Sequence, residues 1–393
     1  MAWWRSRVGK AGFCCLIKNR PRRFNQFPAR HIMMVMNKYL SNIATLALPI
    51  LALTGGQLAY GQNLITRDED WTAINLTVTD ELVIPVYQNM QLVSLDLLTA
   101  TENFCADISV DSLNSLRAAF HQSMAAWQSA QHIQFGPITY FNWNFRLQYW
   151  PDDRGTSARQ LNALIASQDE TVLASDVFPR QSVGVQGLPA LERILFDENT
   201  LSDFQNSSYL CLLSETIARN INEISTGVSQ RWVEEYRAII LDPVESGFYE
   251  GAEDLSIDFL KALQEAIAKI RDLKLLPALG ESFAGARNRA AESWRSEHSL
   301  ANIKSNLNSL ELLFSAYTAA FYEEDVVSVA SAFENLTATL VVLPDSMLLA
   351  LADEEQYAQV QALHAQAEIL HEALETALKN TDLYLGFNSL DGD

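Results

Sequence analysis

From about residue 62 onward, apolar residues recur every three or four positions, and this spacing constrains the fold more than any other feature. It places apolar side chains on one face of an α-helix, which is then buried against other helices. There is no alternation of strands and helices, and the 16 glycines and 11 prolines are too few for an all-β chain of 393 residues. The clearest stripes are Val83, Val86, Met90, Val93 and Leu97; Leu113, Leu116, Phe120, Met124 and Trp127; Ile303, Leu307, Leu310, Phe314 and Tyr317; and Tyr357, Val360, Leu363, Ala367, Leu370, Leu374 and Leu378.

Proline- and glycine-containing stretches interrupt these stripes and predict where helices end. They occur at 135–137, 150–155, 242–247 and 276–280. About eight long helices separated in this way suit antiparallel bundles. We therefore predict an all-α fold of two lobes, each like a four-helix bundle, over 62–241 and 242–393. No glycine-rich phosphate loop occurs, which argues against a nucleotide cofactor.

The first 61 residues contain a segment with the features of an export signal. Residues 37–61 begin with Lys38, continue with an apolar run from Ile43 to Leu53, and end with small residues up to Gly61. This order is typical of a secretory signal peptide, and the run is too short for a stable membrane span. We assign 1–35 to an upstream extension and 36–61 to the signal peptide, and we expect a periplasmic or cell-envelope protein. A true N-terminal membrane anchor is the alternative.

The charge of the chain is unevenly distributed. Nine of the 28 basic residues and none of the 48 acidic ones lie in residues 1–61, so 19 basic and 48 acidic residues remain and the chain from Gln62 carries −29. Such a surface repels phosphate backbones, which argues against a nucleic-acid partner.

Only two cysteines, Cys105 and Cys211, follow the predicted leader. In an oxidising compartment two cysteines favour a disulfide over a metal site. Two separate buried thiols are the alternative.

Three ordered motifs resemble those of the imelysin-like family of exported helical bacterial envelope proteins. They are the segment 183–196, with Gly187-Leu188-Pro189-Ala190-Leu191-Glu192; the stretch from Phe135-Gly136-Pro137 to Trp150-Pro151-Asp152; and the run Ser293-Trp294-Arg295-Ser296 with Leu300-Ala301-Asn302-Ile303. The resemblance implies one imelysin-like domain over about 72–385, with two helical lobes and a site at their junction. Members are regarded either as metallopeptidases or as proteins of iron regulation and transport.

The family marker Gly-x-His-x-x-Glu is altered in this chain, because Pro189 stands at the histidine position. A histidine and a glutamate three residues apart on a helix can share a metal ion, but proline has no lone pair to offer. This departure argues against a metallopeptidase. The sequence does not identify a cofactor. The resemblance implies iron or another divalent metal, and Glu192 is the best candidate for its ligand.

Glu192 lies on the apolar face of its helix, between Leu188 and Leu195. A buried carboxylate needs a partner, and Arg146, Arg154, Arg287 or Arg295 is expected to supply it. On that reading, Glu192→Leu is tolerated only when the arginine is removed as well. A structural Glu–Arg pair and a ligand-binding role remain open. Gly187 is expected to allow close approach of another backbone, and Pro189 suits the first turn of a helix.

Further residues are candidates for the same cleft. Asp152 and Asp153, beside Arg154, either line it or belong to a capped turn, and the turn is favoured. Asn302 and Asn306 either face it or lie in solvent. The dense aromatic group is expected to be core rather than a platform for a ring-shaped ligand such as haem: Phe135, Tyr140, Phe141, Trp143, Phe145, Tyr149 and Trp150.

A second group of potential metal ligands follows helical spacing near the C-terminus: His364, Glu368, His371 and Glu375. Each comes one position after an apolar residue of the stripe, so we expect a solvated helix surface.

Taken together, the sequence predicts an exported, non-catalytic envelope protein that binds a metal or metal complex between two bundles and serves iron or metal acquisition. The alternatives are an imelysin-type metallopeptidase and an envelope interaction module that binds another protein and no small ligand.

Overall fold

The computed structural model describes residues 67–152, 154–381 and 383, which all lie in one compact unit, Gly61–Asp393. This part of the chain consists of helices and connecting turns without a strand, which confirms the all-α class. None of its helices is both long and apolar enough to cross a bilayer. The predicted extension 1–35 and signal peptide 36–61 lie outside the described residues.

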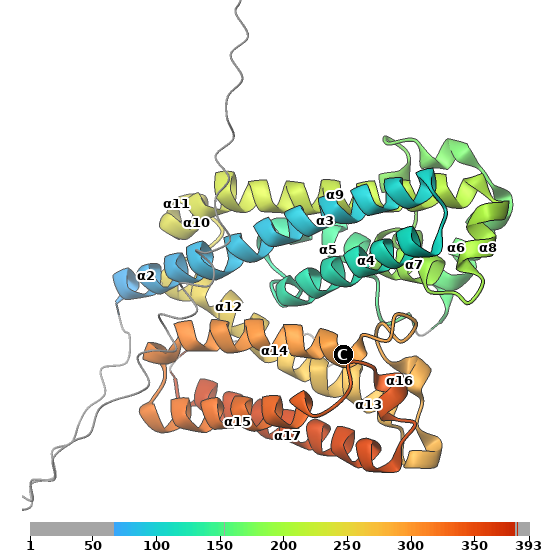
Figure 1. Ribbon diagram of the computed structural model, residues 1–393. Coiled ribbons are helices and arrows are strands. Elements are labelled where there is room, and N and C mark those ends of the chain that lie inside the picture. The colour runs from blue at the N-terminus through green and yellow to red at the C-terminus, as the bar shows by residue number, and fades with distance from the viewer. Residues whose placement is uncertain (1–66, 153, 382, 384–393) are drawn as a thin grey trace, which may run out of the picture. The chain divides into compact units, whose positions relative to one another are not determined.

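The first helices form one packed group (Figure 1). Helix α2 (Asp68–Val78) continues through a π-helical turn, Thr79–Val83, into α3 (Ile84–Ala106). Helix α3 packs on both α4 (Val110–Ala130) and α9 (Ser208–Arg231). Ser109 begins α4 through a reciprocal capping box with Ser112.

Four short helices connect α4 to α9: α5 (Trp143–Leu147), α6 (Thr156–Ser167), α7 (Gly187–Leu195) and α8 (Thr200–Asn206). Of these, α7 packs on both α9 and α4. The segment with the altered motif is therefore held inside the group by two long helices.

After the short helices α10 (Arg237–Leu241) and α11 (Pro243–Ser246), a second group begins with α12 (Ala252–Lys269). Helix α12 packs on α14 (Ser299–Ala316) and α17 (Glu354–Lys379), and α17 packs on α15 (Glu323–Val341). The short α16 (Met347–Ala350) precedes α17. The groups are joined mainly where α14 packs on α4 and α12 packs on α2, and α14 also contacts α2 and the π-helical turn Thr79–Val83. The division at residue 242 stays a prediction.

The helix break expected at 276–280 falls at the last residue of that stretch. Helix α12 continues through a π-helical turn, Ile270–Leu275, into α13 (Leu276–Leu279), which ends at Gly280. Pro277 follows directly on the π-helical turn, where the regular i→i−4 hydrogen-bond pattern is already interrupted. The continuation matters because it carries Lys274 into the interior.

The predicted disulfide between Cys105 and Cys211 is confirmed, with the two Cα atoms 5.6 Å apart. It joins the last turn of α3 to the first turn of α9, 106 residues away in the sequence.

Candidate functional site

Glu192 lies in α7 with only 6% of its surface exposed, as its apolar neighbours predict. Its Oε1 accepts hydrogen bonds from the backbone N–H of Ser296 (2.9 Å) and from the Ser296 hydroxyl (2.8 Å). Burial raises the pKa of Glu192; the Ser296 hydrogen bonds and the charge of Arg295 oppose it. The carboxyl group therefore ties α7 to the segment before α14.

The expected ion pair between Glu192 and an arginine is wrong for the part of the chain that the structure describes. Arg295 acts on Glu192 only through its charge and lies over the Trp294 ring, 4.2 Å from the centroid. Arg154 and Arg287 are exposed. The cost of burying the carboxyl group is instead offset by two hydrogen bonds from one serine.

Arg146 has other partners. It donates to Gln186 Oε1 (3.0 Å) and to Asn220 Oδ1 (2.6 Å), and burial lowers its pKa. Because Gln186 immediately precedes α7, Arg146 positions the start of that helix against α9.

Gly187 opens α7 with φ +73°, a conformation that side chains strain. A Cβ there would lie 2.2 Å from the Arg146 carbonyl oxygen and 2.3 Å from that of Leu147. The backbone therefore approaches as closely as the sequence predicts. Pro189 lies in the first turn of α7, also as expected.

Asp152 caps a helix. Its Oδ1 accepts from the N–H of Thr156 (2.8 Å) and its Oδ2 from that of Ser157 (2.9 Å), at the start of α6. This is the turn that the sequence favoured over a ligand contact, and it leaves both carboxylate oxygens engaged.

Beside Glu192 lies a network of buried polar side chains that the sequence reasoning did not detect. Its centre is Lys274, 2% exposed, whose Nζ lies 3.0 Å from Glu292 Oε2, also 2% exposed. The same Nζ donates to Gln128 Oε1 (2.6 Å) and to Asn306 Oδ1 (2.7 Å). All three N–H groups of Lys274 are thus used.

Glu292 is satisfied on both oxygens. Its Oε1 accepts from Gln148 Nε2 (2.8 Å) and its Oε2 also accepts from Asn302 Nδ2 (3.2 Å). Asn302 further donates to Ser293 Oγ (2.9 Å). Of the two expected alternatives for Asn302 and Asn306, the inward-facing one is correct, because both are buried in this network.

Burial sets the proton affinities in the network. It lowers the pKa of Lys274 to about 8, against the attraction of Glu292, and it lowers the pKa of Lys269 as well. Burial also acts to raise the pKa of Glu292, but the charge and hydrogen bond of Lys274 outweigh it, and the net pKa is lowered. The pair is therefore held as ammonium and carboxylate at neutral pH.

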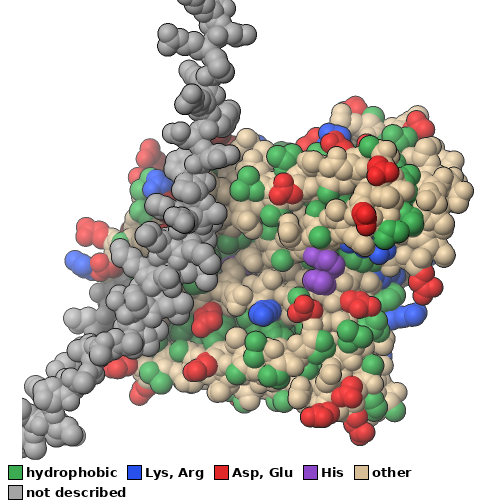
Figure 2. Space-filling view, in the orientation of Figure 1, with side chains coloured by type: hydrophobic (Ala, Val, Ile, Leu, Met, Phe, Trp, Pro, Cys, Tyr) green, Lys and Arg blue, Asp and Glu red, His purple; other side chains and the backbone are tan. Residues whose placement is uncertain are grey.

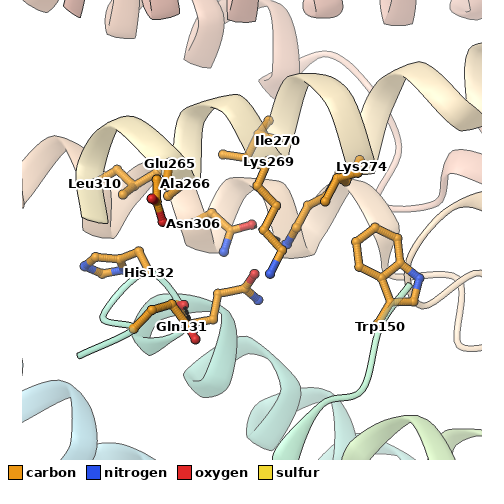
Figure 3. Close-up of a pocket in the computed structure, with 12 residues that line it drawn as sticks. Gln131, His132, Trp150, Glu265, Ala266, Lys269, Ile270, Lys274, Asn306 and Leu310 are labelled. Atoms are coloured by element: carbon orange, nitrogen blue, oxygen red, sulfur yellow. Dashed lines mark hydrogen bonds between the residues drawn. The ribbon is translucent and has the colours of Figure 1, made fainter. Parts of the chain in front are cut away.

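A cavity of about 210 Å³ opens beside the network, between α4, α12 with its π-helical continuation, and α14. Figure 3 shows Lys269 and Lys274 directed into it from one side, with Gln131 facing them and Trp150 at one end. The lining residues are Gln131, His132, Gln134, Trp150, Glu265, Ala266, Lys269, Ile270, Leu273, Lys274, Asn306 and Leu310.

Two histidines stack close to the Glu192 segment. The rings of His121 and His298 are 3.5 Å apart at 16°, and His298 Nδ1 lies 3.1 Å from the Ser296 carbonyl oxygen. Burial and then the charge of His298 lower the pKa of His121 to about 4. Figure 2 shows histidine side chains reaching the surface on this face, among scattered acidic groups.

Within residues 67–152 and 154–383, no group of three or more His, Cys, Asp or Glu side chains could hold a metal ion. The residues at the altered motif therefore do not fit the metal that the family marker implies. On α17, Glu368 pairs with Arg271 (3.2 Å) and Glu375 with Lys379 (2.6 Å). His364, Glu368, His371 and Glu375 are all half-buried, and the Nε2 atoms of the two histidines are buried, so the expectation of a fully solvated helix surface is wrong.

The aromatic group is only partly core. Phe135 packs edge-on against Phe259, with centroids 4.9 Å apart. Phe141 is 69%, Phe145 51% and Tyr149 38% exposed, so the expectation of core packing is wrong for these three. Phe141 and Phe145 lie in and beside the irregular turn 140–142, where the chain cannot bury successive side chains on one face.

The sequence does contain a feature that could have predicted the burial of Lys269, Lys274 and Glu292. Each charged residue lies within an otherwise apolar stretch: Ile267-Ala268-Lys269-Ile270, Leu273-Lys274-Leu275-Leu276 and Ala290-Ala291-Glu292. A charged residue flanked by apolar neighbours on a packed helix indicates a buried, partnered charge.

Comparison with known proteins shows which family and which solved structures this chain is similar to. The family model described as Imelysin matches residues 83–374. An imelysin-like protein from Psychrobacter arcticum 273-4 has a TM-score of 0.68 at 21% identity, over 82% of this chain and 99% of that one. A protein provisionally named iron-regulated protein A precursor, from Parabacteroides distasonis ATCC 8503, has a TM-score of 0.65 at 14% identity, over 80% and 96%. No curated protein matches the chain. At these identities the two structures establish the shared fold alone.

Proposed function

The chain belongs to the imelysin family, and on this premise we propose that it is an exported, non-catalytic binding protein of the cell envelope that serves iron or metal acquisition. The observation that carries the binding role is the cavity of about 210 Å³ with two lysines directed into it, which suits an anionic ligand such as a metal complex rather than a bare metal cation. Few protein sites bury charged groups around open space unless a ligand completes them.

The link to iron is drawn from a relative. The Parabacteroides protein with the same fold carries the name of an iron-regulated protein. A role in the envelope is supported by the leader-like residues 37–61.

A peptidase role is disfavoured by the donor set at the altered motif. Metal-dependent hydrolysis needs a metal-bound water and, for zinc, three protein ligands. Pro189 offers none, and Glu192 Oε1 already accepts two hydrogen bonds from Ser296. Arg295 and Ser296 beside it are donors rather than ligands for a cation.

The test is to purify the protein from the cell envelope, determine its N-terminus, and measure its metal content by native elemental mass spectrometry. We expect a chain that begins near Gln62 and carries iron or another metal within an anionic complex, because the described residues offer no set of ligands for a bare metal ion. A metal-free protein recovered from iron-replete cells would contradict the role in metal acquisition.

Proteolysis is tested on the same preparation with protein substrates, with and without chelator. We expect no cleavage. Chelator-sensitive cleavage that is lost in Glu192→Gln, but kept in Glu311→Gln, would overturn the non-catalytic assignment. Glu311 is the matched control because it is exposed on α14 and undergoes the same change.

A further inference from the structure

The lining of the cavity contains two lysines and one carboxylate, Glu265. Lys269 and Lys274 lie five residues apart, at the end of α12 and in its π-helical continuation, and both side chains point into it (Figure 3). Glu292 is the carboxylate partner of Lys274. The other carboxylate at the cavity, Glu265, lies 3.8 Å from Lys261. Lys269 forms neither of these two ion pairs.

Lys269 is the group with unused hydrogen-bonding capacity. Lys274 donates its three N–H groups to Gln128, Glu292 and Asn306. Within the described residues Lys269 has no hydrogen bond or ion pair, and Glu292 acts on it only through its charge. Its side chain is half-buried and points into the cavity, and burial lowers the pKa of its ammonium. A bound anion would therefore stabilise the charged form.

His132 adds a second unused donor. It is 5% exposed, and neither ring nitrogen has a partner. Burial lowers its pKa to about 4, so the ring is neutral at physiological pH and carries one N–H donor. His132 lines the same cavity as Lys269, on the side of Glu265 (Figure 3).

The volume of the cavity and its apolar lining residues limit the class of ligand that it can bind. A volume of about 210 Å³ is below the roughly 300–1,000 Å³ of sites for drug-sized ligands, which excludes a peptide or a haem. Trp150, Ile270, Leu273 and Leu310 present apolar surface beside the polar donors. Apolar walls next to an ammonium favour an organic anion over a bare inorganic one.

We propose that this cavity binds a small organic carboxylate, with Lys269 as its ammonium partner and His132 as a second donor. The inference rests on the proposed binding function and names the ligand class of that site. Lys274 contributes positive charge and holds Glu292, Gln128 and Asn306 in place.

The experiment is titration calorimetry on the mature chain with succinate, citrate, phosphate and sulfate, using the wild type, Lys269→Gln and Lys304→Gln. Lys304 is the matched control, because it is exposed on α14 and loses the same charge. We expect succinate or citrate to bind the wild type and Lys304→Gln alike, and Lys269→Gln about ten- to a hundredfold more weakly.

Three results would overturn the proposal: no carboxylate binding, equal affinity in Lys269→Gln, or phosphate and sulfate binding as tightly as the carboxylates. If Lys269→Gln does not fold, His132→Phe replaces it. Weakened carboxylate binding in that variant supports the proposal, and unchanged binding overturns it.

The outcome can be distinguished from the test of the iron role. A protein that carries iron but does not bind carboxylates refutes only this inference. A metal-free protein that binds succinate through Lys269 refutes only the iron role.

Discussion

At the scale of single residues, the partner of Glu192 decides what its substitution costs. Glu192→Gln keeps an oxygen that accepts from Ser296 and removes a charge that burial disfavours, so we expect unchanged or slightly higher stability at neutral pH. Glu192→Leu leaves the Ser296 N–H and hydroxyl without a buried acceptor, and we expect a loss of about 1–3 kcal/mol. Denaturant unfolding of the purified variants measures both.

The control for this prediction is Arg295→Met in the Glu192→Leu background. Because Arg295 forms no ion pair with Glu192, its removal should not restore stability. Restoration by Arg295→Met would show that the two side chains are a buried pair after all.

The buried His132 makes the free energy of unfolding depend on pH. Burial holds its pKa near 4 in the folded chain, against about 6.5 when unfolded, so only the unfolded state takes up a proton between these values. This residue's contribution is complete above pH 6.5, falls as the pH is lowered, and is lost below about 4. The loss attributable to His132 is about 3 kcal/mol.

We expect His132→Phe to lose less stability than the wild type between pH 7 and pH 4, by about that amount. Chemical denaturation at a series of pH values gives the two curves. The difference between variants isolates His132 from the carboxyl groups, which titrate in both. Parallel curves would mean that the ring is already protonated in the folded state.

At the scale of elements, α7 depends on how closely its first residue approaches the chain before it. In Gly187→Ala the new Cβ would lie 2.2 Å from the Arg146 carbonyl oxygen, in a left-handed conformation that alanine resists. The clash is with backbone, which cannot rotate away.

We expect Gly187→Ala to lower the unfolding free energy by more than about 2 kcal/mol, or to prevent folding. Thermal unfolding monitored by circular dichroism measures the loss. Gly247→Ala is the matched control for the conformation alone, since Gly247 has φ +74° but no atom within 4 Å of its Cβ position. Equal losses in the two variants would mean that close approach contributes nothing.

At the scale of the whole molecule, the disulfide closes a loop that contains most of the first group of helices. Cys105 and Cys211 are 106 residues apart, and the bond limits the unfolded chain more than the folded one. We expect reduction, or Cys105→Ser with Cys211→Ser, to lower stability by about 2–4 kcal/mol without changing the helical content. Mass spectrometry without reductant checks the bond, and two free thiols in exported protein would contradict it.

The helical architecture was open to prediction because its causes are local. Stripes such as Leu113 to Trp127 and Tyr357 to Leu378 correspond to α4 and α17, since helical period and burial coincide there. The break predicted at 276–280 falls at its last residue, Gly280, because the helix runs past Pro277 through the π-helical turn. The candidate site was only half predictable, since the burial of Glu192 followed from its neighbours and its partner did not.

By itself, the sequence determined an all-α protein of the imelysin family, the disulfide between Cys105 and Cys211, and the loss of the marker histidine at Pro189. These follow from residue type, spacing and motif, which act over a few positions. Only the tertiary structure decided that Ser296 holds Glu192 and that Lys274 meets Glu292 beside a cavity. The physical reason is that a buried charge takes whichever donor or acceptor packing brings within about 3 Å, here across 104 residues for Glu192.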